Sequence, residues 1–283
     1  MNSEPIRANP LLSNPFEQAL RSELLLSLRA STPPQLREAL EYALFPGGAR
    51  LRPALCMLVA EACGDAESRW TMAAACAIEM VHGASLVHDD LPCFDDAERR
   101  RGRPSLHAKY GESMAVLVGD ALLVAAFGVL GRSGNARGVE ILAEASGPGS
   151  GIIAGQAWEL EPSAPLEEYH RAKTASLFEA AAALGAISSG ANEGAWRAFG
   201  AFLGMAFQAA DDLGDIGVVD LGKPTGKDAA LGRPSIVRTE GPVAARQRVK
   251  SLLDRARAEI PESKTSMPLQ RWLEGLAQEL LRR

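Results

Sequence analysis

Six aspartates stand at the ends of two otherwise apolar segments. They form one DDxxxxD cluster and one DDxxD cluster: Asp89, Asp90 and Asp95, and Asp211, Asp212 and Asp215. Like charges gathered at a helix end are unfavourable unless a cation lies between them. Carboxylate oxygens that leave coordination positions open suit Mg2+, which completes its octahedron with phosphate and water. The two clusters therefore predict magnesium sites that hold a diphosphate.

The residues around Asp89 indicate how the first cluster converges. His82 and Asp89 are seven residues apart, so a helix places them on one face. Pro92 disfavours helical geometry at Leu91. The chain is therefore expected to loosen there, and Asp95 can return to the side of Asp89.

The second cluster shares a face with an amide. Asp211 and Asp215 are four residues apart and Gln208 lies one turn earlier. One acidic pair on a helix is a weak signal, but two clusters that each close an apolar helix are a strong one.

Basic residues accompany the acids. They are Arg50, Arg52, Arg99, Arg100, Arg101, Arg103, Lys173, Lys223 and Lys227. Each taken singly is better explained as an ordinary surface charge, yet guanidinium forks bind phosphate oxygens bidentately. Together they suit two polyanionic substrates, one held through metal and one held directly by bases.

Composition predicts an all-α protein. The 283 residues include 47% hydrophobic and only 5% aromatic side chains, and no long alternating Val/Ile/Thr runs occur. The net charge of -5 argues against nucleic-acid binding through the overall field.

The compartment is expected to be the cytoplasm. The N-terminal segment lacks the apolar core of a signal peptide. The four cysteines have no zinc-type spacing and are expected to be buried reduced thiols. The most apolar segment, 114–130, is shorter than a span of about 20 residues and contains Asp120, so we expect a core helix and no membrane span.

Periodicity and turn signals divide the chain into a flexible arm, residues 1–15, and a single helical domain, residues 16–283. Helices are predicted at 16–28, 35–43, 54–63, from about 67, 71–90, 114–131, 137–146, 151–160, 166–188, 195–215, 243–260 and 269–281. Two long polar interruptions, 95–109 and 218–240, are predicted as functional loops because each follows an acidic cluster.

Over nearly its whole length the chain resembles the trans-isoprenyl diphosphate synthases, the polyprenyl synthetase family. The matching segments are GGARLRP, HGASLVHDDLPCFDDAERRRGRPSLH, GDALL, GQAWEL, HRAKTASLF, FQAADDLGD and GKPTGKDAALGRPS. The resemblance implies an all-α bundle around a deep central cavity, commonly a homodimer. It also implies Mg2+-dependent condensation of isopentenyl diphosphate with dimethylallyl, geranyl or farnesyl diphosphate.

The resemblance also implies residue roles. The six aspartates would bind Mg2+ that grips the allylic diphosphate, and Asp89, Asp90, Asp95, Lys173, Asp211 and Asp212 would be catalytic. The allylic substrate would contact Arg100, Lys173, Thr174, Gln208 and Lys227. Isopentenyl diphosphate would contact Arg52, His82 and Arg101. The metals and bases would neutralise the leaving diphosphate so that an allylic cation forms, and the isopentenyl double bond would attack it.

Two positions depart from the family pattern. Ala49 replaces the first lysine of GGKRxRP, and Arg233 stands where many members carry lysine. Both changes resemble the bacterial geranylgeranyl diphosphate synthases.

Product length is expected to follow pocket depth. Ala84 and Ser85, one turn before Asp89, are small and should let a growing chain pass. A C20 product is therefore predicted, with Met80, Val81 or Met114 as the floor.

Other functions stay open at this point. A farnesyl or longer product requires only a different pocket depth. The hypothesis that the chain is a non-catalytic subunit of a heteromeric synthase is supported only by Ala49. The two retained acidic clusters argue against it. A terpene cyclase needs one diphosphate site where this chain offers two. A plain helical scaffold explains none of the motifs.

Overall fold

The structure is a computed structural model, and it describes residues 14–45, 47–65, 68–215, 233–261 and 266–282. Its longer helices are α1 (Asn14–Leu26), α2 (Pro34–Leu44), α3 (Leu51–Ala62), α4 (Arg69–Asp89), α6 (Glu112–Arg132), α7 (Ala136–Ser146), α10 (Ser176–Ile187), α11 (Glu193–Leu213), α14 (Pro242–Ala258) and α15 (Met267–Leu280). Its short helices are α5 (Leu106–Tyr110), α8 (Ile152–Trp158), α9 (Leu166–His170) and α13 (Ile236–Glu240). The all-α prediction is confirmed, since the strands of the described residues are two dipeptides.

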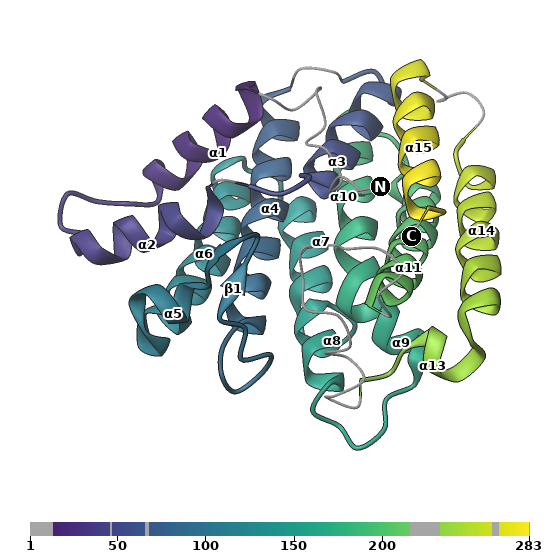
Figure 1. The fold of residues 1–283 in the computed structure, drawn as a ribbon. Helices are drawn as coiled ribbons and strands as arrows, with labels where there is room; N and C mark the ends of the chain where they lie inside the picture. Colours follow the sequence, from purple (N-terminus) through teal and green to yellow (C-terminus); the bar gives the residue numbers. More distant parts are fainter. Residues whose placement is uncertain (1–13, 46, 66–67, 216–232, 262–265, 283) are drawn as a thin grey trace.

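Helices α4 and α10 form the centre of the bundle, with α3, α6, α7 and α11 around them (Figure 1). The sequences of α4 and α10 are apolar nearly all round and rich in alanine, as expected for helices with neighbours on several sides. Ser68 caps α4, because its Oγ accepts a 2.9 Å hydrogen bond from the Thr71 amide. Buried apolar side chains form one connected cluster from Phe16 to Leu280.

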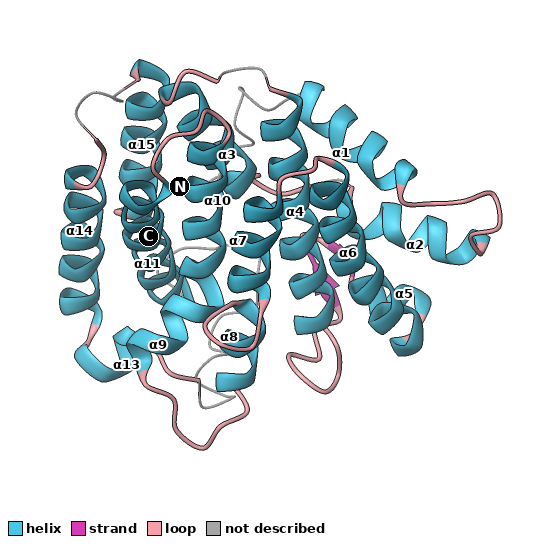
Figure 2. Ribbon diagram, turned by 180° about the vertical axis from the view of Figure 1, so that it is seen from behind, coloured by secondary structure: helices cyan, strands magenta, loops and turns pink. Residues whose placement is uncertain are grey.

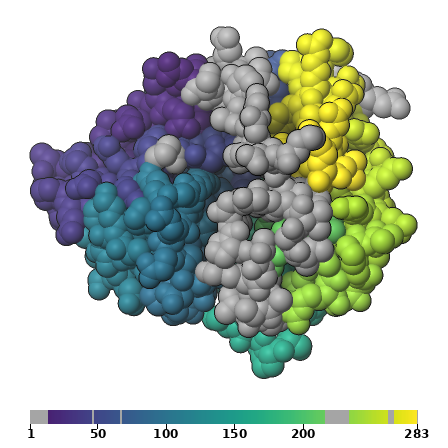
Figure 3. Space-filling model, in the orientation of Figure 1, coloured from purple at the N-terminus to yellow at the C-terminus, as the bar shows by residue number. Residues whose placement is uncertain are grey.

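The outer helices enclose this centre. Helices α1 and α2 form one side of the molecule and α14 and α15 the opposite side (Figure 3). Helices α8, α9 and α13 lie together at one end of the bundle, as the front and rear views agree (Figures 1 and 2). That end also receives the C-terminal ends of α4 and α11, where the aspartate clusters are.

The two polar interruptions contain structure that the sequence did not predict. Strands β1 (Arg99–Arg100) and β2 (Arg103–Pro104) form an antiparallel ribbon, and α5 follows it. Helix α13 lies within the second interruption. The predicted helix at 166–188 is present as continuous helical turns, but residues Arg171–Ala175 (η2) are wound as a π-helix. Helix α4 is one helix from Arg69, not two.

The prediction of four buried cysteines is correct for three. Cys56, Cys63 and Cys76 are buried, whereas the thiol of Cys93 is exposed. Burial raises the pKa of Cys56 to about 12, so this thiol stays protonated.

Candidate functional site

The first aspartate cluster forms where α4 ends. After Asp89 the chain turns back, and the Asp95 amide donates a 2.9 Å hydrogen bond to the Asp89 carbonyl. This bond places Asp95 beside Asp89, as the proline at position 92 had suggested. The Asp89 carboxylate also accepts a 2.9 Å hydrogen bond from Gln156 Nε2, which comes from α8.

Asp90 differs from its neighbours because both of its oxygens are already engaged. Arg100, on the ribbon, donates through Nε and NH2 to the two Asp90 oxygens at 2.7 Å each. Burial and the charges of Asp89 and Asp95 raise the pKa of Asp90, and Arg100 opposes that rise. The structure therefore joins the predicted metal ligand Asp90 and the predicted phosphate contact Arg100 to each other.

In the second cluster, too, one aspartate is hydrogen-bonded within the protein while the other two are more exposed. Asp212 is buried and accepts hydrogen bonds from Gln208 Nε2 at 2.9 Å and from the Ile236 amide at 2.8 Å. His170 Nε2 lies 3.3 Å from the Asp212 carboxylate. Asp211 and Asp215, by contrast, are partly exposed on one face. Asp212 thus ties α11 to α9 and α13.

Lys173 stands between the first cluster and a buried glutamate. Its Nζ donates a hydrogen bond to Glu159 and lies 4.0 Å from the Asp89 carboxylate. Burial alone would lower the pKa of Lys173, but the negative charges of Asp89 and Glu159 raise it above its usual value. Lys173 is therefore a cation in a negative field, next to the predicted metal site.

A polar chain runs from η2 to the second cluster. The Thr174 hydroxyl donates to Gln208 Oε1, and Gln208 Nε2 donates to Asp212. Because both ends of the Gln208 amide are engaged, its dipole has a fixed direction. The π-helical winding of η2 accompanies this arrangement, as π-helical turns often do at functional sites.

A second, basic cluster consists of Arg52, His82 and Arg101. Arg52 NH1 lies 3.3 Å from His82 Nε2, and the Arg101 guanidinium reaches the backbone of Gly48. Burial lowers the pKa of Arg52 to about 10, and burial together with Arg52 and Arg101 lowers the pKa of His82 well below its usual value. Arg52 Nε and His82 Nδ1 are buried and have no hydrogen-bond partner.

Those orphaned donors indicate an anion. Across the described part of the chain, neither Arg52 nor Arg101 forms an ion pair with a carboxylate. Buried donors left unpaired cost free energy that a bound phosphate group would recover. The chemistry of this basic cluster therefore suits a second diphosphate that is held without metal.

Arg50 is not part of that basic cluster, although the sequence analysis grouped it with Arg52. Its guanidinium is buried and bonds to Glu17 at 2.8 and 3.0 Å, to Glu79 at 2.5 Å and to the Leu44 carbonyl at 2.8 Å. Two carboxylates thus neutralise Arg50, so its role is structural. It fastens the loop before Arg52 to α1 and α4.

The aspartates fit a divalent metal that arrives with phosphate. The described residues contain no group of three or more His, Cys, Asp or Glu side chains close enough to hold a metal by protein ligands alone. Mg2+ rarely uses such a cage, because it keeps several waters and takes one or two carboxylates besides substrate phosphates. Asp89, Asp95, Asp211 and Asp215 supply hard oxygen donors of this kind.

Some predicted residues lie outside this geometry. Lys227, like Lys223, lies outside the described residues. Ala84 and Ser85 are buried in α4, and the Ser85 hydroxyl donates to the His82 carbonyl at 2.8 Å. The structure therefore places the small residues one turn below Asp89, as expected.

The proposal of Met114 as a pocket floor is wrong. Helix α6 runs antiparallel to α4, since a side chain at Gly119 would overlap the His88 ring while Gly83 lies against Leu122. This register puts Met114 on the aspartate side of Ala84, whereas Met80 and Val81 lie on the far side, where a floor must be.

Sequence reasoning missed three buried polar residues: Gln156, Glu159 and His170. Gln156 and Glu159 lie within GQAWEL, a segment that carries the family resemblance but to which the sequence analysis assigns no residue role. A polar residue on an otherwise apolar helix face would have been the signal, but α8 and α9 are too short to show a face.

Comparison with known proteins identifies the family. The family model described as polyprenyl synthetase matches residues 33–267. Geranylgeranyl diphosphate synthases of Cereibacter sphaeroides and Rhodobacter capsulatus are each 46% identical; the alignments cover 87% and 88% of this chain and 90% and 89% of those proteins. A solved polyprenyl synthase of Caulobacter crescentus, complexed with calcium and isoprenyl diphosphate, is 27% identical with a TM-score of 0.82, covering 96% of each chain. This chain belongs to the polyprenyl synthetase family.

Proposed function

We propose that this chain is a Mg2+-dependent prenyltransferase that condenses isopentenyl diphosphate with an allylic diphosphate and releases geranylgeranyl diphosphate. One observation carries the proposal: besides two aspartate clusters, the chain has a separate group of Arg52, His82 and Arg101 that brings positive charge and two buried nitrogens, Arg52 Nε and His82 Nδ1, that are unpaired among the described residues. A head-to-tail condensation needs two diphosphate sites of these two kinds. The two relatives at 46% identity are named for the same product.

The residues would divide the work as follows. Arg52, Arg101 and neutral His82 hold the isopentenyl diphosphate by direct hydrogen bonds. Asp89, Asp95, Asp211 and Asp215 would hold the metal. When bound, Mg2+ would supply positive charge that offsets the charge on the departing diphosphate.

Lys173 and Gln208 act on the allylic end. Lys173 carries its charge beside Asp89, where it can bind the same diphosphate. Gln208 is held between Thr174 and Asp212, so its oriented amide can stabilise a developing cation without reorganising. Most of these groups are buried, which keeps water from the cation.

Product length rests on α4. Ala84 and Ser85 leave little side-chain bulk below Asp89, and Met80 and Val81 follow one turn deeper. An Ala84→Tyr variant should therefore stop growth early and release farnesyl diphosphate. Unchanged C20 output from that variant would refute growth along α4 and favour a different route for the prenyl tail.

The quaternary state that we propose is a homodimer formed through α6. Two helices, α4 and α6, are long and apolar enough to cross a membrane by length and composition alone, but α4 is mostly buried in the bundle. On α6, Leu117 and Val124 are 54% and 73% exposed and lie on one stripe. A second copy of this chain covers such a stripe in a homodimer, so a membrane span is not required.

One assay tests the function. The purified chain is incubated with Mg2+, labelled isopentenyl diphosphate and, in turn, dimethylallyl, geranyl or farnesyl diphosphate, and the dephosphorylated alcohols are separated. We expect geranylgeraniol from each starter. No incorporation by the chain alone would point to a non-catalytic subunit, and product that forms without isopentenyl diphosphate would point to a cyclase.

A further inference from the structure

Glu159 is the centre of a buried ionic cluster beside the first aspartates. Its side chain is only 2% exposed. It accepts hydrogen bonds from Lys173 Nζ and from the Tyr169 hydroxyl at 2.6 Å, and Arg233 NH2 lies 3.1 Å from its second oxygen. The second oxygen forms this ion pair but accepts no hydrogen bond from the described residues. Glu159 therefore anchors Lys173 by a hydrogen bond and Arg233 by charge.

Arg233 links this anchor to the metal side of the site. The same NH2 that contacts Glu159 donates to Asp95 Oδ1. Arg233 itself is 8% exposed, so this contact is largely shielded from water. Its guanidinium therefore lies on an oxygen of Asp95, one of the residues assigned above to the metal.

The backbone of Arg233 is fixed to the second cluster. Its carbonyl accepts a 2.8 Å hydrogen bond from Arg238 NH1 in α13. At the start of α13, the Ile236 amide donates to Asp212. Arg233 thus spans the site: its main chain is tied to the second aspartate cluster and its side chain to the first.

One carboxylate oxygen cannot hold a guanidinium and a divalent cation in the same place. We propose that Arg233 is an internal counter-ion that competes with the metal for Asp95, and that metal binding releases its guanidinium to the diphosphate. Glu159 keeps the released side chain within reach, because it holds Arg233 independently of Asp95. This inference rests on the proposed function.

Arginine suits this exchange better than the lysine that many members carry. A planar guanidinium presents donors in a fixed fork, so it can bridge two carboxylates and later two phosphate oxygens. A lysine ammonium is a compact point charge. The substitution at position 233 therefore adds a bridge that a lysine would form less well.

The test measures metal binding in place of turnover. Mn2+ is titrated into the purified full chain without diphosphate, and free Mn2+ is followed by electron paramagnetic resonance. An Arg233→Gln variant should bind Mn2+ about tenfold more tightly than the wild type, because a competing charge is gone. With Mn2+ saturating, the same variant should bind inorganic pyrophosphate about tenfold more weakly.

Two variants serve as controls. Arg248→Gln removes one positive charge from the exposed side of α14, where Arg248 contacts only Glu167 at 3.5 Å in the described structure. It should change neither affinity. Arg233→Lys keeps the charge beside Asp95 and should stay within about twofold of the wild type in Mn2+ affinity.

Opposite shifts for the two ligands distinguish competition from simple damage, which would weaken both. An Mn2+ affinity that is unchanged or weaker in Arg233→Gln overturns the inference, as does an equal gain in Arg248→Gln. Failure of the proposed function would look different: the wild type would bind no Mn2+ even with pyrophosphate and would not incorporate isopentenyl diphosphate.

Discussion

At the scale of single residues, adjacent aspartates have different tasks. Asp90 is bonded through both oxygens to Arg100, whereas Asp89 accepts one hydrogen bond from Gln156 and lies 4.0 Å from Lys173. A DDxxxxD motif therefore contains one structural acid among its ligands. The same holds for Asp212, whose oxygens bond to Gln208 and Ile236.

This division predicts different outcomes for two isosteric changes. Asp90→Asn leaves Arg100 without its counter-charge, so the free energy of unfolding should fall by roughly 2 kcal/mol in urea titrations. Asp89→Asn keeps an oxygen that can accept from Gln156, so stability should stay within about 0.5 kcal/mol. Its half-saturating Mg2+ concentration should instead rise about tenfold. Equal losses of stability in the two variants would contradict this assignment.

At the scale of elements, the approach of α8 to η2 positions Lys173. A Cβ at Gly155 would lie 2.3 Å from the Lys173 amide nitrogen and Cα, which are backbone atoms that cannot rotate away. The turn that carries Lys173 and Thr174 can therefore sit close to α8 only if position 155 is glycine.

Gly155→Ala should displace Lys173 and lower kcat at least about tenfold, with a smaller effect on the affinity for isopentenyl diphosphate. The matched control is Gly275→Ala in α15, where an added Cβ meets no atom within 4 Å. Because alanine favours helix, that control should keep full activity and gain about 0.5 kcal/mol of stability. Steady-state kinetics in each substrate separate the two effects.

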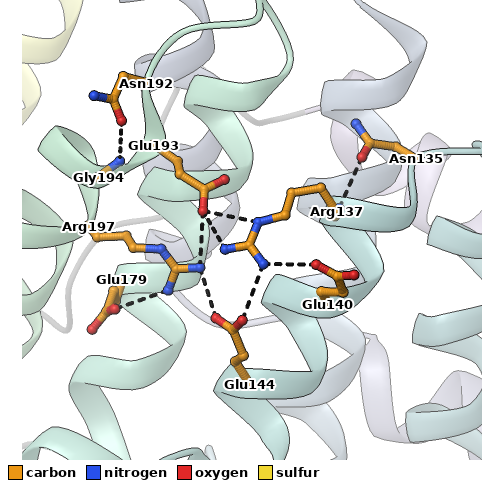
Figure 4. A network of polar contacts seen from close by, with 10 residues as sticks. Asn135, Arg137, Glu140, Glu144, Glu179, Asn192, Glu193, Gly194 and Arg197 are labelled. Carbon is orange, nitrogen blue, oxygen red and sulfur yellow. Dashed lines mark hydrogen bonds and ion pairs between the residues drawn. The ribbon is translucent and has the colours of Figure 1, made fainter.

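A second set of elements is joined by charge. Arg137 from α7 and Arg197 from α11 share Glu144 and Glu193, and Arg197 also contacts Glu179 of α10 (Figure 4). Burial alone would raise the pKa of Glu193, but the hydrogen bond and charge of Arg137 and the charge of Arg197 hold it below its usual value.

A carboxyl whose pKa is lowered by folding stabilises the protein above its unfolded pKa and loses this contribution as pH falls through the folded pKa. Glu193→Gln should therefore cost up to about 1 kcal/mol at pH 7, the range of exposed ion pairs. The difference from the wild type should vanish toward pH 3. High salt should shrink it as well, since the network lies at the surface. A constant difference between pH 7 and pH 3 would exclude a charge effect.

At the scale of the whole molecule, the sequence predicted what depends on local pattern. The acidic clusters and most helix positions follow from periodicity and from the cost of acids in apolar helices. The ribbon was not predicted; it turns at Arg101 and Gly102, whose φ angles are both positive, 51° and 77°, as a tight hairpin turn requires. The sequence did not predict which carboxylate pairs with which base. The Arg50–Glu79 and Asp90–Arg100 pairs join residues 29 and 10 positions apart, and only packing brings them together.

Packing also determines which apolar surface remains exposed to solvent. Helix α6 buries one face against α4, with Val118 and Leu122 fully covered, while Leu117 and Val124 point outward. Exposed apolar side chains on a long helix are costly in water, although Asp120, which is also exposed, lies between Leu117 and Val124. Burial of that stripe against a second copy would recover this cost. The dimer would then also support α4, which packs against α6 and carries the first aspartate cluster.

A charge placed on the stripe should therefore separate the subunits. Val124→Glu should convert a dimer to a monomer in light scattering coupled to size exclusion, because an unpaired carboxylate in an apolar interface is costly. Val243→Glu is the matched control, since Val243 is 71% exposed on α14, away from α6. It should leave the mass unchanged. If both variants and the wild type show a monomer mass, α6 does not carry a dimer, and its apolar stripe must be covered by something other than a second copy.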